Sequence, residues 1–132
     1  MADTLPPAGR RQLAHATRNN DTIAARLMLS AGLPVDGFSQ HHATPLHWAS
    51  WHGNAELVRL ILQRNPPIEN DDNEYKGTPL NWAIHGSENG WYRDKGDYGA
   101  TVELLLAAGA RPPEQAAGTP SVRAVLNRHG IR

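Results

Sequence analysis

Histidine is the residue type in this chain with the widest chemical repertoire. Seven histidines stand at positions 15, 41, 42, 47, 52, 85 and 129. Neutral imidazole nitrogens bind zinc and other metals, which makes four of these residues candidate ligands: His41, His42, His52 and His85. No two histidines lie four residues apart on one predicted helix face, and no carboxylate stands at ligand spacing. The sequence therefore predicts no metal site.

Nucleophilic catalysis also lacks its usual residue patterns. Ser50 lies two residues before His52, but positions i and i+2 of a helix point in different directions. The sequence has no Gly-x-Ser-x-Gly motif and no glycine-rich phosphate loop after a strand. It has no cysteine, which excludes thiol catalysis, disulfides and cysteine-bound metal. We expect no catalytic residue and no cofactor, and thus a protein that is not an enzyme.

The four tryptophans are better placed for binding than for catalysis. Trp48 and Trp82 occupy equivalent positions in two copies of a repeated motif, and we expect both beside the contact between repeated units. Trp51 falls at the end of the same predicted helix as Trp48, and His85 holds its position one unit later. A large exposed aromatic side chain is typical of an interaction site. Trp51 is therefore a candidate partner contact, with packing on its neighbours as the alternative.

Composition limits the classes of partner. The chain has 132 residues, with thirteen basic and thirteen acidic side chains and a formal net charge of zero. Nucleic-acid binders usually carry a basic excess, so we expect no nucleic-acid partner. No apolar run is long enough to span a bilayer. The first seven residues lack a basic stretch followed by an apolar one, which argues against a secretion signal. A cytoplasmic protein without a membrane partner is the expectation.

The elements that position these residues come from an internal repeat. The sequence Thr44-Pro45-Leu46-His47-Trp48-Ala49 returns one period later as Thr78-Pro79-Leu80-Asn81-Trp82-Ala83. Leu27-Met28-Leu29 precedes Leu60-Ile61-Leu62 by nearly the same interval, and Leu104-Leu105-Leu106 follows after a longer one. One unit of about 33 residues thus occurs three times, and the third copy carries ten extra residues.

Each unit is predicted to form two short helices. Thr44 is a good N-cap and Pro45 suits the first helical position, which predicts a helix from 45 to 52 that ends at Gly53. Asn54 can cap a second helix, whose apolar stripe is Leu57, Leu60 and Ile61. The same Thr-Pro start recurs at Thr78-Pro79 and Thr119-Pro120. Residues 68 to 76 are polar, which indicates an extended excursion or hairpin.

These motifs resemble ankyrin repeats. The resemblance rests on Thr44 to Ala49, on Gly53 to Leu62 and on Leu104 to Ala110. It implies an all-α solenoid of three helix-turn-helix repeats, at about residues 10–36, 42–70 and 76–111, followed by a C-terminal capping helix within 114–130. The whole chain, 1–132, would form a single domain. In this family the motif histidine, here His47, ties the start of its helix to the neighbouring hairpin.

The resemblance implies a non-catalytic protein–protein interaction module that binds another protein through its concave face and hairpin tips. The resemblance, together with the insertion in the third unit, implies these partner contacts: Phe38, Gln40, His41, Trp51, His52, Glu74, Tyr75, His85, Trp91 and Tyr92. Two alternatives remain open. One is a dedicated inhibitor or antitoxin-like regulator of one enzyme. The other is a small-molecule-binding protein or enzyme that uses the groove rich in histidine and tryptophan.

The insertion in the third unit, residues 86–98, has three aromatic residues and several glycines. It is expected to emerge where the first helix of the unit ends, and to bring Trp91 or Tyr92 toward the same concave surface. The glycines at 90, 96 and 99 are expected to make its path adaptable. The composition resembles a recognition loop. In the alternative, Trp91 and Tyr98 fold back to cover an open edge of the stack.

Overall fold

The computed structural model describes residues 7–132, with side chains from residue 11 onward. The prediction that the first seven residues carry no secretion signal falls, except for Pro7, outside this part. The described chain is all helical, as predicted, and has no strand. Its elements are α1 (Pro7–Arg18), α2 (Thr22–Ser30), the 3₁₀ turn η2 (Gln40–His42), α3 (Pro45–Trp51), α4 (Ala55–Leu62), α5 (Pro79–Asn89), α6 (Tyr98–Ala107) and α7 (Pro120–Arg128).

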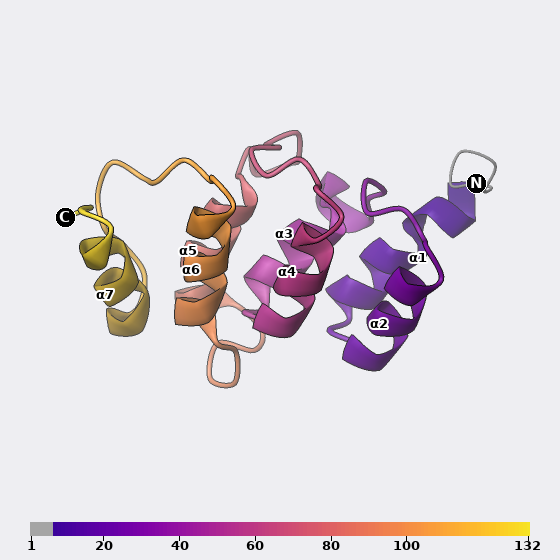
Figure 1. Cartoon of the computed structure of the whole chain (residues 1–132), viewed down its shortest axis with the longest axis horizontal. Coiled ribbons are helices and arrows are strands. Elements are labelled where there is room, and N and C mark those ends of the chain that lie inside the picture. Colours follow the sequence, from indigo (N-terminus) through magenta and orange to yellow (C-terminus); the bar gives the residue numbers. More distant parts are fainter. Residues whose placement is uncertain (1–6) are drawn as a thin grey trace.

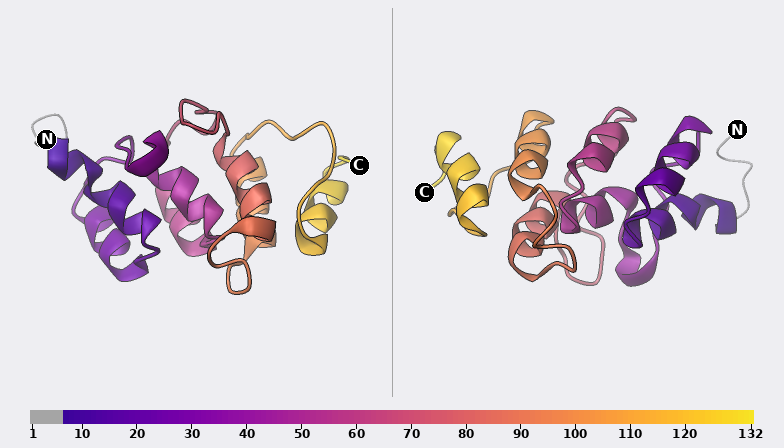
Figure 2. Two further views of the ribbon diagram at one scale, coloured as in Figure 1. Left: turned by 180° about the vertical axis from the view of Figure 1, so that it is seen from behind. Right: turned by 90° about the horizontal axis from the view of Figure 1, so that it is seen from below.

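Three helix pairs stack side by side along the long axis of the molecule (Figures 1 and 2). Repeat one is α1 with α2, repeat two is α3 with α4, and repeat three is α5 with α6. The first helices pack in the order α1, α3, α5, and the second helices in the order α2, α4, α6. Helix α7 packs on α6 at the end opposite the N-terminus. The predicted three-repeat architecture with a C-terminal helix is confirmed.

Side-chain caps fix where most helices begin. Thr44 and Thr78 each accept a hydrogen bond from the backbone N–H three residues on, and a proline follows both. Asn54 caps α4 as predicted, and Gly53 takes the left-handed conformation (φ 65°) that follows a helix end. Thr119 differs, because its side chain makes no capping bond to α7. The predicted third use of the Thr-Pro cap is therefore only partly realised.

The core runs through the stack between the helix layers. In α4 the predicted stripe is correct for Leu57 and Ile61, which are fully buried, whereas Leu60 is only partly covered. Val58, which is expected to widen the stripe, is fully buried as well. In α6 the positions equivalent to Val58 and Ile61 are Val102 and Leu105, both fully buried. Each repeat covers its neighbour's apolar face, because a two-helix unit has too little core of its own.

The insertion is shorter than the sequence predicts. Helix α5 does not end near residue 86 but continues to Asn89, so residues 86–89 are helical, and Tyr98 already belongs to α6. Only residues 90–97, here called the insertion loop, are irregular. Gly86 allows the extra turn, because a Cβ at this position would lie 2.3 Å from the carbonyl oxygen of Trp51.

Two of the insertion's glycines have a packing role that the sequence does not predict. A Cβ on Gly90 would lie 2.7 Å from the carbonyl oxygen of Trp51, and one on Gly96 would lie 2.4 Å from that of His52. The amide of Asp97 donates to the carbonyl of Gly53 at 2.8 Å. These glycines therefore serve close packing of the insertion loop on repeat two.

Candidate binding site

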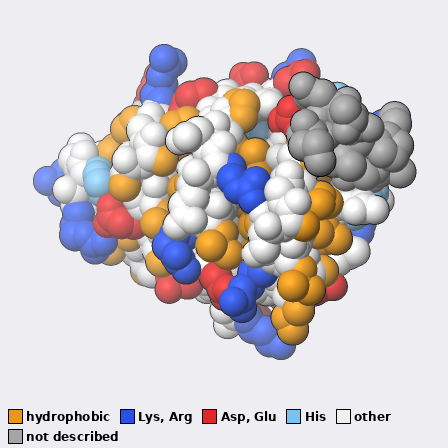
Figure 3. All heavy atoms as spheres, turned by 45° about the vertical axis from the view of Figure 1, so that its right-hand side comes forward, with side chains coloured by type: hydrophobic (Ala, Val, Ile, Leu, Met, Phe, Trp, Pro, Cys, Tyr) orange, Lys and Arg blue, Asp and Glu red, His pale blue; other side chains and the backbone are white. Residues whose placement is uncertain are grey.

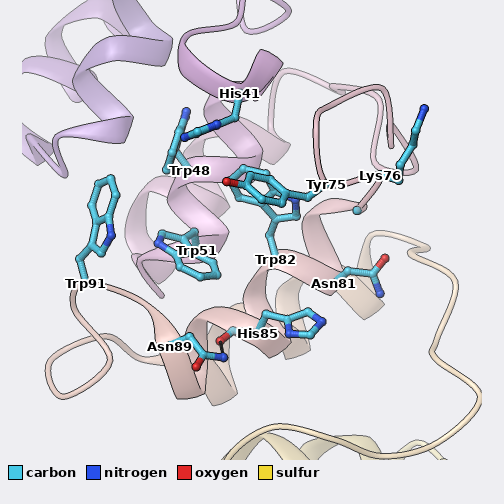
Figure 4. Close-up of a pocket in the computed structure, with 11 residues that line it drawn as sticks. His41, Trp48, Trp51, Tyr75, Lys76, Asn81, Trp82, His85, Asn89 and Trp91 are labelled. Atoms are coloured by element: carbon cyan, nitrogen blue, oxygen red, sulfur yellow. Dashed lines mark hydrogen bonds between the residues drawn. The ribbon is translucent and has the colours of Figure 1, made fainter.

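All four tryptophans of the chain line one cavity of about 570 Å³. This aromatic cavity lies where α3 and α5 run side by side, and the loop before α5 and the insertion loop complete its wall (Figure 4). Its lining residues are His41, Trp48, Trp51, Tyr75, Lys76, Gly77, Asn81, Trp82, His85, Asn89 and Trp91. Five of the ten predicted partner contacts are among them, namely His41, Trp51, Tyr75, His85 and Trp91.

Trp82 is the central ring of the aromatic cavity. Its plane stands at 90° to that of Trp48, at 72° to that of Trp51 and at 74° to that of Tyr75, with centroid distances of 5.3, 6.0 and 5.9 Å. Trp48 and Trp82 are buried, as their equivalent repeat positions predict. The Nε1 of Trp48 donates to the hydroxyl of Ser39 at 2.8 Å, whereas the Nε1 of Trp51 is buried without a partner.

The loops before α3 and α5 meet at the rim of the cavity. His41 Nδ1 lies 2.8 Å from a carboxylate oxygen of Glu74, and the Glu74 amide donates to the His41 carbonyl at 3.1 Å. The ring of Tyr75 lies 5.3 Å from that of His41, and 65% of its surface is exposed. Three of the five predicted tip residues, His41, Glu74 and Tyr75, therefore come together, although the segment 68–76 contains no strand.

His47 holds the loop before α5 in place. Its Nε2 lies 2.9 Å from the carbonyl oxygens of both Asn70 and Gly77, so this nitrogen must carry the proton and donate. Its Nδ1 faces the hydroxyl of Thr44 at 2.8 Å. Burial lowers the pKa of His47, because the charged form loses its hydration. The role implied by the resemblance is the one observed.

Arg18 is a site residue that the sequence motifs do not reveal. Its Cζ lies 5.7 Å from the ring centroid of Trp48 and 5.3 Å from that of Trp91. These are cation–π distances. Trp48 and Trp91 themselves lie 5.6 Å apart. The repeat phase carries the missing signal, since Arg18 stands one repeat period before His52.

His52 does not reach the surface, so its predicted presentation to a partner is wrong. It is 1% exposed, and its Nε2 donates to the carbonyl of Arg18 at 2.7 Å. Burial lowers the pKa of this histidine as well. The ring of Tyr92 packs against it at 5.0 Å and 89°. His52 and Tyr92 thus support the insertion loop from outside the aromatic cavity.

The predicted insertion, residues 86–98, contains one exposed ring and one buried ring. Trp91 lines the aromatic cavity and remains 55% exposed. Tyr98 is buried, and its hydroxyl donates to the carbonyl of Trp51 at 2.6 Å. Burial raises the pKa of Tyr98 to about 12. One end of the insertion thus presents a ring and the other closes the edge of repeat two.

Phe38 and Gln40 lie apart from the aromatic cavity. The ring of Phe38 lies 3.7 Å from that of His42, and the guanidinium of Arg11 stands over it at 5.7 Å. Gln40 is exposed at the start of η2.

His85, by contrast, is exposed on α5 and lines the aromatic cavity.

Two further properties of residues 11–132 bear on chemistry. No three histidine, aspartate or glutamate side chains within this range gather closely enough to hold a metal ion. Among the described helices, none combines the length and apolarity needed to cross a membrane. On the face shown in Figure 3, basic and acidic side chains are intermixed among apolar ones.

Comparison with known proteins settles the family. The model of ankyrin repeats in three copies matches residues 13–116. The chain belongs to the ankyrin repeat family. The human ankyrin repeat domain of ASB11 superposes with a TM-score of 0.70 over 92% of this chain and 55% of that one, at 16% identity. At this identity the likeness shows the fold alone.

The chain spans only a small part of the length of the curated relatives that it matches. Human "Ankyrin repeat, SAM and basic leucine zipper domain-containing protein 1" is 35% identical over 94 residues, which cover 70% of this chain and 18% of that protein. "Palmitoyltransferase Hip14" of Drosophila melanogaster is 29% identical over 100 residues, which cover 76% of this chain and 14% of that enzyme. The activities that these names state belong to those proteins.

Proposed function

We propose that this ankyrin repeat chain is a non-catalytic protein-binding module whose partner contacts the aromatic cavity and the loop tips at its rim. Ankyrin repeats are generally protein–protein interaction modules. The observation that carries the proposal is the exposure of Trp91 and Tyr75, at 55% and 65%, beside a partly covered Trp51. Clustered exposed aromatic side chains are typical of interaction sites and of binding hot spots.

The residues of this site have graded roles in the proposal. Trp51, Tyr75, His85 and Trp91 form its centre, because all four line the aromatic cavity and retain exposed surface. His41 and Glu74 form the rim. Phe38 and Gln40 would touch only a partner that extends beyond the cavity, and Tyr92 belongs to the support of the insertion loop.

A small-molecule ligand is the second candidate, and the size of the cavity favours it. Ligand sites of about 300–1,000 Å³ are typical of small molecules, and the aromatic cavity, at about 570 Å³, falls in this range. An inhibitor or antitoxin-like regulator would use the same surface for one tight partner. A cytoplasmic location without nucleic-acid or membrane partners stays part of the proposal.

Affinity capture from native lysate tests protein binding. Immobilised wild type is compared with Trp91→Ala and Tyr75→Ala, which remove exposed rings at the cavity, and with Leu27→Ala. Leu27 is 67% exposed on α2 and serves as the matched control for loss of apolar surface. We expect a stoichiometric partner that wild type and Leu27→Ala retain and that both cavity variants lose. Equal capture by all four proteins would refute this site.

A further inference from the structure

We infer that the occupant of the aromatic cavity is a partner segment in which an aromatic or branched apolar side chain stands next to a carboxylate. The inference rests on the proposed function and adds the chemistry of the partner. It combines two properties of the cavity wall, an aromatic side and a side with unmatched hydrogen-bond donors.

The aromatic side forms a receptacle for one flat or branched apolar group. The planes of Trp48, Trp51 and Tyr75 stand at 72° to 90° to the plane of Trp82, with centroids within 6.0 Å of it. Figure 4 shows Trp91 at one end of this set of rings and Tyr75, beside Trp82, at the other, with Trp48 and Trp51 between them. The set is called the aromatic row. Trp48 and Trp82 are buried and back this wall, so the rings with free surface for an anchor side chain are Trp51, Tyr75 and Trp91. Burial of an aromatic group is the main source of energy in hot spots.

The other side of the cavity carries donors and no carboxylate. Asn81 uses its Oδ1 to accept from the amide and hydroxyl of Thr78, at 3.1 and 2.9 Å, which leaves its Nδ2 for an occupant. Lys76 and His85 line the cavity, and neither side chain forms a hydrogen bond or ion pair with any residue of 11–132. No lining residue is acidic. The Glu74 carboxylate at the rim already binds His41.

Charge complementarity therefore favours an anionic group beside the apolar anchor. A carboxylate can accept from the Asn81 amide and the His85 imidazole. Figure 4 shows the Lys76 side chain extended outward from the cavity, away from both residues, and its flexible chain can turn its ammonium toward an anionic group. A cationic occupant is disfavoured for two reasons. Lys76 would repel it, and Arg18 already stands over Trp48 and Trp91.

The extent of the aromatic row favours a peptide segment over a free acid. Tyr75 and Trp91 are more than half exposed at opposite ends of the row, so one small acid inside the cavity leaves both rings uncovered. A chain that runs along the row covers both, and its flanking residues add contacts that a free acid lacks.

The test uses short peptides and a reporter that the protein supplies. All four tryptophans line the cavity, so tryptophan fluorescence reports its occupancy directly. Four capped seven-residue peptides share one neutral scaffold. The first has a central phenylalanine flanked by two aspartates. The second and third replace the aspartates by asparagines and by lysines, and the fourth replaces the phenylalanine by alanine. Free phenylpropionate forms a fifth arm.

We expect the aspartate peptide to bind most tightly, followed by the asparagine and then the lysine peptide, with binding lost in the alanine peptide. Added salt should weaken binding of the aspartate peptide but leave binding of the asparagine peptide unchanged. Lys76→Gln should weaken that peptide roughly twofold to fivefold, the size of an exposed ion pair. Lys95→Gln removes the other lysine of the chain, which lies outside the cavity lining, and should change nothing. Tyr75→Ala should weaken every phenylalanine-containing peptide.

Three outcomes would overturn the inference, and they separate it from the proposed function. Tightest binding of the lysine peptide would make the occupant cationic and leave protein binding intact. Tighter binding of phenylpropionate than of any peptide would overturn both, in favour of a small-molecule site. No fluorescence change with any peptide at millimolar concentration would refute this occupant, and the capture experiment would then decide on protein binding alone.

Discussion

His47 and His52 show how single buried imidazoles join neighbouring repeats. Each is almost fully enclosed and donates from Nε2 to a backbone carbonyl of another segment, at Gly77 and Asn70 for His47 and at Arg18 for His52. Desolvation lowers the pKa of both from the ordinary 6.5. Both therefore remain neutral in the folded protein under conditions in which the unfolded chain takes up protons.

This pKa shift gives the protein an acid-sensitive stability. Because the unfolded state binds more protons below about pH 6.5, the free energy of unfolding should be constant above that pH and fall below it. Each buried histidine contributes at most about 1.4 kcal/mol per pH unit. His47→Asn should flatten this fall and cost about 1–2 kcal/mol at neutral pH, because the Asn70 carbonyl loses its donor, whereas the Gly77 carbonyl keeps the side-chain amide of Asn73. Urea unfolding at about pH 7.5 and 5.5 measures both effects. Parallel pH profiles for wild type and variant would contradict the assignment.

For single residues, the sequence predicts burial and contacts where the position belongs to the repeated motif. Trp48, Trp82 and His47 belong to the repeated motif, so their burial and contacts follow from it. His52 and Arg18 stand at the ends of their helices, where a small change in direction decides between solvent and interior. The insertion loop settles that choice, because it covers His52 and brings Trp91 over Arg18. No motif encodes such a contact.

The second helix of a repeat stabilises the protein through its buried leucines. In α6, Leu105 is fully buried, whereas Leu104 next to it is only partly covered. Leu105→Ala should lower the free energy of unfolding by about 2–5 kcal/mol, since it loses transfer free energy and leaves a cavity. Leu104→Ala is the matched control and should cost clearly less. Thermal and urea unfolding of both variants gives the difference. Equal losses of unfolding free energy would show that the buried face of α6 is assigned wrongly.

Helix α5 gains an additional turn because Gly86 passes close to repeat two. Alanine is a better helix former than glycine by about 1 kcal/mol, yet the Cβ of Gly86→Ala would lie 2.3 Å from the carbonyl oxygen of Trp51. The clash should dominate and destabilise the protein by about 1–3 kcal/mol, as overpacking does. Gly99→Ala in α6 has its nearest contact at 3.7 Å and should stabilise by up to about 1 kcal/mol. Opposite shifts of the melting temperatures test the pair.

Helix starts can be predicted from the sequence far better than the end of α5. Thr44, Asn54 and Thr78 carry their capping groups in the sequence, so α3, α4 and α5 begin where expected. The end of α5 depends on space beside Trp51 in another repeat, and a glycine in the sequence does not tell whether it stops a helix or lets it pass. For the same reason the sequence predicts a longer irregular insertion than the structure has.

For the molecule as a whole, α7 covers the last apolar face. Val122, Val125 and Leu126 are buried against α6. Burial of each such side chain contributes about 1.5–3 kcal/mol, so their sum approaches the stability of a small domain, about 5–15 kcal/mol. A chain that ends at residue 113 should therefore be largely unfolded or aggregated at 37 °C. Circular dichroism and size-exclusion chromatography measure this, with Arg123→Ala as a control that keeps α7. A folded, monomeric truncated chain would show that α7 is dispensable.

Arg18 lies in repeat one, and the ring that it meets at 5.3 Å, Trp91, belongs to repeat three. In an ordinary repeat array each repeat contacts only its neighbours, so the free energy is a sum of single-repeat and nearest-neighbour terms. Either terminal repeat can then unfold while the others stay folded. The contact between Arg18 and Trp91 adds a next-nearest-neighbour term that spans repeat two. Fraying at either end must break it, which lowers the population of species with one open end. This short array should consequently unfold in a single cooperative step, like a domain without repeats.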